Sequence, residues 1–374
     1  MTDPQRAPDG GQQGILPLPN HEAAGLSTGR TDGLAQVTPS EAANEVLYRP
    51  GLADGHVESL FLKGNSPDGQ RALWLKYTLL APRGGGRDVA ELWAIAFDRS
   101  HGAPRANKRT YPVARAELRR APFGLTLPDG ELGHGVARGA LGFDAEGGPR
   151  LCWDLRYACP EQPFRPFPSA RMYTGAFPRT KTLTPVPDTE LHGSFEVDGE
   201  RWDVTCFRAA QGHNWGKGHA HAYAWAHANA LTPQPGSAPF GRAWLEVISG
   251  RVRVGPVLSP WLTCAALALD GELFRFDGPR AMLSRRVHCD ARSFHFALRH
   301  GAATLSARLW ADESTLAGLR YRDPDGQLLA CLNSKLACAE LTLAARGRTW
   351  SMRSEQAALE LGTRRSDHGI TLLV

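Results

Sequence analysis

GSFEVDGERWDVTCF, residues 193–207, places two β-type runs on either side of Asp198-Gly199. An Asp-Gly pair between such runs is the strongest short-range signal of a β-hairpin, because both central residues of the tight turn must take positive φ. The same pair recurs as Asp270-Gly271, between LTCAALAL and ELFRF, and as Asp325-Gly326, before QLLACL. The chain therefore predicts a series of antiparallel hairpins.

Segments outside these hairpins support the same fold class. SFHFALRH (293–300) and ATLSARLW (303–310) alternate polar and apolar residues, as strands with one wet face do. Helical periodicity is nearly absent: Thr38-Pro39-Ser40-Glu41 predicts the capped start of a short helix to about Leu47, and residues 354–361 are the best remaining helical candidate. Strands at this spacing predict an all-β protein built from antiparallel sheets, sandwiches or barrels.

Length and composition fit a folded protein of more than one small module. The 374 residues are 42% hydrophobic and 22% charged, which excludes general disorder and suits two domains or one large β-rich domain. Residues 1–37 are rich in Gly, Pro, Gln and Asp without any period, so we expect a disordered tail. The segment 159–188 holds seven prolines; we expect a connection or lid that packs across a surface, and no central strand.

Several classes of protein are disfavoured. The net charge of +5 is mild, and doublets such as Arg119-Arg120 indicate solvated loops, with no basic run interleaved with stacking aromatics, so no nucleic acid is expected. We find no apolar stretch long enough to span a membrane and no secretory signal. Seven scattered cysteines without a CxxC pair indicate a reduced, cytoplasmic protein. No cofactor motif is present, no cofactor is expected, and the oligomeric state stays open.

The most informative stretch is QGHNWGKGHAHAYAWAH, residues 211–227. From residue 219, large polar-aromatic residues alternate with alanines, so a strand would place all five large side chains on one face over roughly 26 Å. These five are His219, His221, Tyr223, Trp225 and His227. We expect them on the inner wall of a barrel, lining a cavity, while the alanine face lets a neighbouring element approach closely. The alternative is an ordinary strand with its aromatic side in a packed core and its histidines at the rims.

The same stretch raises the question of a metal. His219 and His221 point the same way on a strand and could chelate one ion. A third ligand is needed, and the sequence does not decide between His213, His227, Glu246 and Asp203, so we predict no metal and keep a His-ligated metal hydrolase as an alternative. Nucleophilic catalysis has less support, because there is no GxSxG elbow and no phosphate loop. Cys206 and Cys264 lie in apolar strand contexts and are expected in the core.

GHNWG (212–216), followed by an aromatic strand that ends in WAH, resembles the HNWG-type motif of the carotenoid 1,2-hydratase and AttH-like proteins. Tocopherol cyclases and lipocalin-like Diels–Alderases are more distant relatives of that group. The stretches 56–82, 182–216 and 331–343 resemble its opening strands, its approach to the motif and its final strands, so the resemblance covers about residues 46–345.

The resemblance implies two successive lipocalin-like (calycin) β-barrel halves that meet near residues 185–210. The expected division is a tail with a short helix at 1–44, an N-terminal half at 45–200 and a C-terminal half at 201–374. It also implies a hydrophobic ligand, isoprenoid- or polyketide-like, and acid-promoted hydration, cyclisation or cycloaddition in the enzymatic members. Hydratase-like members are expected to carry an Asp near the motif, whereas this chain has Gln211 and Gly212 there.

The leading hypothesis is therefore a cavity enzyme, and its rival is a non-catalytic binding protein of the same shape. The enzyme needs a buried carboxyl group, which desolvation keeps protonated and ready to donate to an alkene. Glu58 is the first candidate and Glu246 the second. We expect Trp215 to pack over the ligand while His213 and Asn214 bind a polar group or position a water. The alternative is that Trp215 plugs a barrel end and His213 caps backbone groups.

Overall fold

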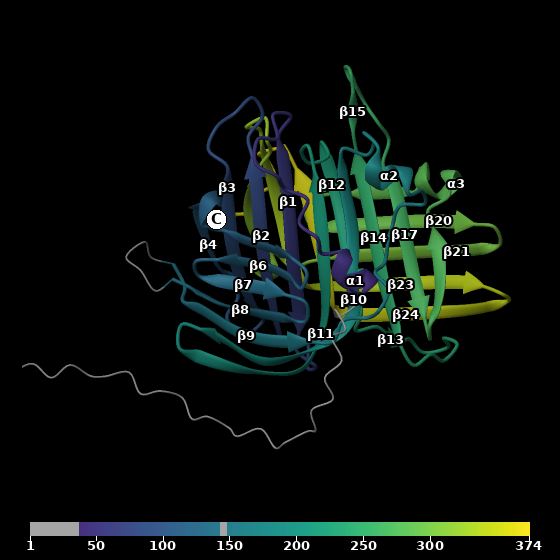
Figure 1. The fold of residues 1–374 in the computed structure, drawn as a ribbon. Helices are drawn as coiled ribbons and strands as arrows, with labels where there is room; N and C mark the ends of the chain where they lie inside the picture. Colours follow the sequence, from purple (N-terminus) through teal and green to yellow (C-terminus); the bar gives the residue numbers. More distant parts are fainter. Residues whose placement is uncertain (1–36, 143–147) are drawn as a thin grey trace, which may run out of the picture. The chain divides into compact units, whose positions relative to one another are not determined.

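The computed structural model describes residues 37–142 and 148–374, so the expected disordered tail lies, apart from Val37, outside the described residues. Antiparallel β-strands dominate the regular structure of the described residues, which confirms the all-β prediction (Figure 1). Its helices are single turns, and none of the described helices is long and apolar enough to cross a membrane. They are α1 Pro39–Ala42, α2 Arg171–Thr174, α3 Pro279–Met282 and the 3₁₀ turns η1 Val113–Arg115 and η2 Glu313–Thr315.

The first sheet contains the first eleven strands in the order β4-β3-β2-β1-β11-β10-β9-β8-β7-β6-β5. The pairings between its described strands are antiparallel, and among them only the join of β1 to β11 connects strands that are distant in sequence. The strands are β1 His56–Asn65, β2 Arg71–Ala81, β3 Val89–Asp98, β4 Arg105–Pro112, β5 Glu117–Arg120, β6 Phe123–Leu127, β7 Gly130–Gly133, β8 Val136–Leu141, β9 Leu151–Tyr157, β10 Thr180–Val197 and β11 Glu200–Gly216.

The second sheet has the order β18-β17-β14-β12-β24-β23-β21-β20-β19, with β13 paired to β24 and β22 paired to β23. Here the early strand β12 joins the last strand, β24. The strands are β12 Ala222–Ala228, β13 Thr232–Pro233, β14 Ala243–Arg251, β17 Leu262–Leu269, β18 Glu272–Phe276, β19 Val287–Cys289, β20 Ser293–His300, β21 Ala303–Trp310, β22 Ala317–Arg322, β23 Leu328–Ala345 and β24 Arg348–Thr363. A separate ribbon pairs β15 Arg253–Val254 with β16 Val257–Leu258.

Two of the three predicted Asp-Gly turns are confirmed, and at the third, Asp325-Gly326, only Gly326 takes positive φ (82°). Asp198 and Gly199 have φ of 52° and 89° between β10 and β11, and Asp270 and Gly271 have φ of 49° and 85° between β17 and β18. The two alternating segments are β20 and β21, whose inward residues are buried while their outward residues are at least partly exposed. The predicted N-terminal helix is present and shorter than expected, with the Thr38 hydroxyl accepting from the Glu41 N–H.

Two predictions about local structure are wrong. Residues 354–361 are not helical, because they belong to β24 and pair with both β12 and β23. The proline-rich segment is only partly a connection, because its last residues form the start of β10. Pro185 and Pro187 are tolerated there since both lie at register shifts, where β10 does not need their missing N–H groups to pair with β11.

Hydrophobic packing forms three layers. Each sheet curls around a core of its own, and a third cluster of aromatic and aliphatic side chains fills the space between the two sheets. This third cluster joins Phe61, Trp74 and Trp93 of the first sheet to Trp225 and Tyr321 of the second. The first sheet ends at residue 216 and the second begins at residue 222. The division into independent halves at residue 200 stays a prediction.

The close join of β1 and β11 gives a test of the fold. A Cβ atom on Gly212 would lie 2.2 Å from Phe61 Cζ, whereas one on Gly250, also in a strand, would meet nothing nearer than 3.6 Å. We expect Gly212→Ala to lower the free energy of unfolding by about 1–3 kcal/mol, because the Phe61 ring must move within a packed layer. The matched variant Gly250→Ala should stay within about 1 kcal/mol of wild type in urea unfolding. Equal effects of the two variants would contradict this packing.

Candidate functional site

A cavity of about 430 Å³ lies between the two sheets. It is bordered by the faces that the central strands turn away from their own cores: β1 contributes Ser59 and Phe61 to the cavity, while Leu60 between them points into the first core. The apolar wall is largely aromatic and includes Trp74, Tyr223, Trp225 and Tyr321. A volume of this size and a wall of this chemistry suit a small hydrophobic molecule.

Strand β12 forms one wall of the cavity, and its two faces point in the directions opposite to those that we expected from the sequence. Ala224, Ala226 and Ala228 point into the core of the second sheet, and Tyr223 and Trp225 face the cavity between the sheets. The prediction that the large side chains line the inside of a barrel is therefore wrong. The pattern of large and small residues was identified correctly, but the small residues occupy the crowded interior and the large ones fill the gap between sheets.

His219 and Asp323 form a hydrogen-bonded dyad on the cavity wall. Nδ1 of His219 lies 2.7 Å from Oδ1 of Asp323, and the same oxygen accepts the His219 backbone N–H at 2.8 Å. Arg364 donates to the other oxygen of this carboxylate. Burial opposes ionisation of Asp323, but its bonds to His219 and Arg364 outweigh burial and lower its pKa to about 2.

The dyad leaves one nitrogen of His219 available. Since Nδ1 faces a carboxylate, that nitrogen carries the ring proton, and Nε2 has no hydrogen-bond partner among the described residues. The ring is held by nearly parallel contacts with Tyr223 and Tyr321, whose centres lie 6.3 Å and 5.4 Å away. Sequence reasoning identified His219 but missed Asp323. The acidic cluster in YRDPDG, just after a strand, was the available signal.

A buried lysine, which sequence reasoning also missed, forms another part of the wall. Lys76, in the largely apolar strand β2, lines the cavity, and its Nζ lies 3.6 Å from the centre of the Tyr321 ring. A second buried lysine, Lys335, lies behind Trp74 and is neutralised by Glu360 Oε1 at 2.8 Å. A lysine inside an apolar strand was the signal in the sequence that could have identified Lys76.

The remaining predicted ligand-binding residues are only partly brought together. Asn214, Trp215 and His221 line the same cavity as Tyr223 and Trp225. His227 does not: it is fully buried, its Nε2 donates to the carbonyl of Pro187 at 2.8 Å, and burial first, then the charge of Lys63, lowers its pKa well below the usual range. The ring of Trp215 packs against His213.

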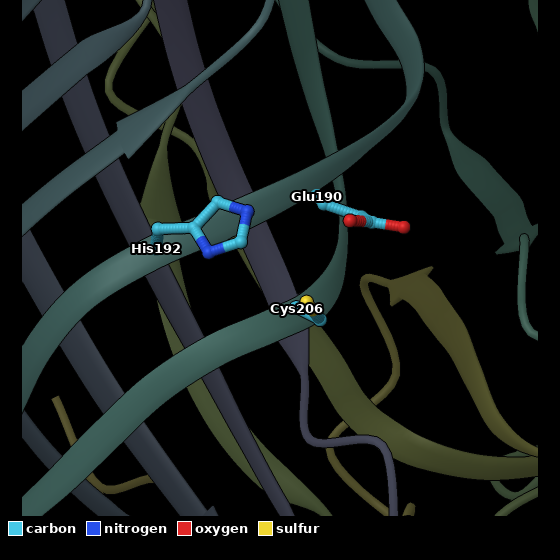
Figure 2. A group of neighbouring side chains, drawn as sticks. All are labelled: Glu190, His192 and Cys206. Carbon is cyan, nitrogen blue, oxygen red and sulfur yellow. The ribbon is translucent and has the colours of Figure 1, made fainter.

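The described residues do not support a metal site at the His219-x-His221 pair, because Asp323 occupies Nδ1 of His219 and no third ligand is grouped with the two rings. The one described group with metal-ligand geometry is Glu190, His192 and Cys206, whose ligand atoms lie within 4.8 Å of one another (Figure 2). All three are exposed on β10 and β11, away from the cavity. Cys206, expected in the core, is exposed because it lies at a register shift with φ of 54°; Cys264 is buried as expected.

Glu58 occupies the face of β1 opposite to the cavity. Its buried carboxylate accepts hydrogen bonds from the backbone N–H groups of Leu47 and Tyr48 at 2.8 Å and 2.7 Å. Nε2 of His56 and Nε2 of His213 lie 2.9 Å and 2.8 Å from it. Burial opposes ionisation, but these donors outweigh it and lower the pKa of Glu58 to about 2. The expectation that burial keeps this group protonated is wrong, and an ionised carboxylate outside the cavity is unsuited to proton donation.

His213 belongs to the same network. Its Nδ1 lies 2.7 Å from the carbonyl oxygen of Ala43, so both ring nitrogens face hydrogen-bond acceptors. The side chain fixes the segment that follows α1 onto β1 and β11. The geometry favours the alternative in which His213 caps a backbone group, while Asn214, the next residue, faces the cavity.

Glu246, unlike Glu58, is a buried carboxyl group whose pKa is raised by desolvation. It is fully buried, and burial raises its pKa to about 7 in spite of hydrogen bonds from Thr184 and Trp225. The Thr184 hydroxyl lies 2.7 Å and 2.6 Å from the two carboxyl oxygens. The Thr184 hydroxyl has a single proton and can donate it to only one of the two carboxyl oxygens. The second short contact is explained if the carboxyl group is protonated and donates to the hydroxyl oxygen. Glu246 lies behind the Trp225 indole, whose Nε1 is 3.3 Å away, and does not itself line the cavity.

Comparisons with known proteins agree with this fold. No family model and no curated protein matches the sequence. A crystal structure of a candidate AttH protein from Nitrosomonas europaea is similar, at 14% identity and a TM-score of 0.50, over 84% of this chain and 98% of that one. Structures of CghA with Sch210972 (11% identity, TM-score 0.48, 82% and 88% covered) and of kievitone hydratase from Nectria haematococca (9%, 0.47, 88% and 97%) are also found. The similarity to the Nitrosomonas europaea structure and the two curled antiparallel sheets confirm the AttH-like resemblance and the two lipocalin-like halves at the level of the fold.

The Glu58 network predicts a specific loss of stability in acid. Because the pKa of Glu58 in the folded protein lies below the ordinary glutamate value of 4.5, ionised Glu58 stabilises the fold above about pH 4.5, and this contribution is lost as the pH falls toward 2. In Glu58→Gln this pH dependence should disappear, and the free energy of unfolding at pH 7 should drop by about 3–5 kcal/mol. Urea unfolding from pH 7 to 3 measures both effects. Glu340→Gln, at an exposed position, is the control. If Glu58→Gln still lost stability in acid as wild type does, Glu58 would not be the group responsible.

Glu246 predicts the opposite pH dependence. Its folded pKa is raised, so its contribution is complete below about pH 4.5 and is lost as the pH rises to 7. Relative to Glu246→Gln, which can keep the bonds to Thr184 and Trp225, wild type should lose about 3 kcal/mol across this interval and no more above pH 8. Urea unfolding of the two proteins at matched pH tests this. A stability difference that is constant from pH 4.5 to 8 would show that Glu246 is ionised throughout.

Proposed function

We propose that this protein is an enzyme that acts on a hydrophobic small molecule by proton transfer in the cavity between the two sheets. The observation that carries the proposal is the His219–Asp323 dyad, which presents a free imidazole nitrogen at the wall of an aromatic cavity. A histidine oriented by a carboxylate is a recurrent device for acid–base catalysis. The reaction class that suits it is acid-promoted hydration or cyclisation of an isoprenoid- or polyketide-like compound.

The apolar and the polar residues that line the cavity have different roles in this reaction. Phe61, Trp225 and the other rings hold the carbon skeleton and exclude bulk water, which strengthens electrostatic interactions at the site. When protonated, Nε2 of His219 donates its proton to a carbon–carbon double bond, and water or a group of the same molecule adds to the resulting cation. The proton released by that addition returns to Nε2, so the enzyme is regenerated.

Asp323 and Asn214 have supporting roles in this scheme. The carboxylate of Asp323 stays ionised and fixes the ring orientation and the tautomer of His219. Asn214 lines the cavity next to Ser59, its partner across the β1–β11 join, and both can hydrogen-bond a water or a polar group of the substrate. The seven cysteines are all free thiols, which suits a reducing compartment such as the cytoplasm.

Mutation of the dyad tests the proposal. Wild type should convert compounds in a hydrophobic extract of the source cells into products heavier by one water or into isomers, detected by mass spectrometry. His219→Ala and Asp323→Asn should lower that rate by about 100-fold or more while retaining bound substrate. His221→Ala, which removes a second imidazole from the same cavity, is the matched control. Binding without conversion by wild type would instead establish the non-catalytic binding protein, and full activity of both dyad variants would remove the dyad from the mechanism.

A further inference from the structure

The ammonium group of Lys76 is a buried cation without a polar partner. The residue is 6% exposed and lines the cavity, yet it forms no hydrogen bond or ion pair with any residue in the described ranges. Its contacts are with ring faces: Nζ lies 3.6 Å from the centre of Tyr321, 5.6 Å from Trp74 and 5.8 Å from Trp93. Cation–π contacts compensate for only part of the lost hydration of an ammonium group.

The nearby carboxylates do not neutralise Lys76, because each has another partner. Glu360 pairs with Lys335 at 2.8 Å, and Glu91 pairs with Lys108 at 3.4 Å. The remaining titratable neighbour is the thiol of Cys331, whose pKa burial raises to about 12, so it is uncharged near neutral pH. The two carboxylates are therefore balanced by Lys335 and Lys108, and the thiol is uncharged. The positive charge of Lys76 is left in excess at this wall of the cavity.

We propose that Lys76 binds an anionic oxygen of the ligand, so that the cavity selects hydrophobic acids: molecules with an apolar skeleton and a carboxylate, phenolate or enolate. The inference rests on the proposed function in taking this cavity as the substrate site, but it concerns binding and not the proton transfer. The anion would be the hydrogen-bond and ion-pair partner that Lys76 lacks among the described residues. A charge-assisted hydrogen bond is strong where the surroundings are of low polarity. The rings around Lys76 would hold the adjacent part of the skeleton.

The protonation of Lys76 should be visible in the pH dependence of binding. Burial lowers the pKa of this amine to about 8, against the opposing charges of Glu360 and Glu91. A carboxylate ligand should therefore lose affinity as the pH rises from 7 to 9.5, because the amine loses its proton over this range. An uncharged ligand of the same skeleton should bind equally at both ends.

The experiment uses two probes that differ in one group, 4-(1-pyrenyl)butyrate and 4-(1-pyrenyl)butanol, in fluorescence titrations of the full chain. Wild type should bind the acid more tightly on the order of tenfold or more at pH 7, and Lys76→Met should abolish that preference by weakening only the acid. Lys217→Met is the matched control, since Lys217 lies at the same cavity but is paired with Asp54. It should leave the preference unchanged.

Each outcome decides the proposal. Equal binding of acid and alcohol by wild type, or an unchanged preference in a folded Lys76→Met variant, would overturn it. If Lys76→Met does not fold, the pH titration of wild type decides: the preference must fall between pH 7 and 9.5, and its persistence would overturn the proposal. An acid preference together with active dyad variants would retain this inference and reject the proposed catalysis.

Discussion

The structure depends on one constraint: the central strands of both sheets are buried on both faces. Strand β1 is buried along its whole length, with one face in the first core and the other in the layer between the sheets. Polar side chains on such strands must find partners inside the protein. Glu58, His213 and Glu246 find them within the fold, whereas Lys76 and Nε2 of His219 have none and both border the cavity. Lys76 and His219 thus bring two unpaired, chemically reactive groups to the same cavity, which is why we place the chemistry there.

The fold could be predicted from local signals. Asp-Gly turns and period-two alternation are properties of a few adjacent residues, so the hairpins at 198–199 and 270–271 were found without knowledge of the rest of the chain. Predictions failed where a distant strand overrides local preference. Residues 354–361 become a strand because they are held between β12 and β23, and the alanine face of β12 points inward because the second core is crowded at that point.

The site was only half predictable, for a related reason. The HNWG stretch and the aromatic strand identified Asn214, Trp215, His219, Tyr223 and Trp225, which do line one cavity. Their partners come from far away in the sequence: Asp323 is 104 residues from His219, and His213 is 155 residues from Glu58. The sequence made Glu58 and Glu246 candidates for a buried carboxyl group, but it does not tell whether such a group meets four N–H donors, as Glu58 does, or a single hydroxyl and an indole, as Glu246 does. Those partners decide the direction of each pKa shift.

The central claim is that the space between the sheets, and neither barrel interior, receives the ligand. A crystal structure of the protein soaked with 4-(1-pyrenyl)butyrate tests this claim most directly. We expect the pyrene ring against Phe61, Tyr223 and Trp225, with the carboxylate of the probe within hydrogen-bond distance of Nζ of Lys76. Density for the probe inside either curled sheet, or a cavity filled by rearranged side chains with the probe bound elsewhere, would contradict it.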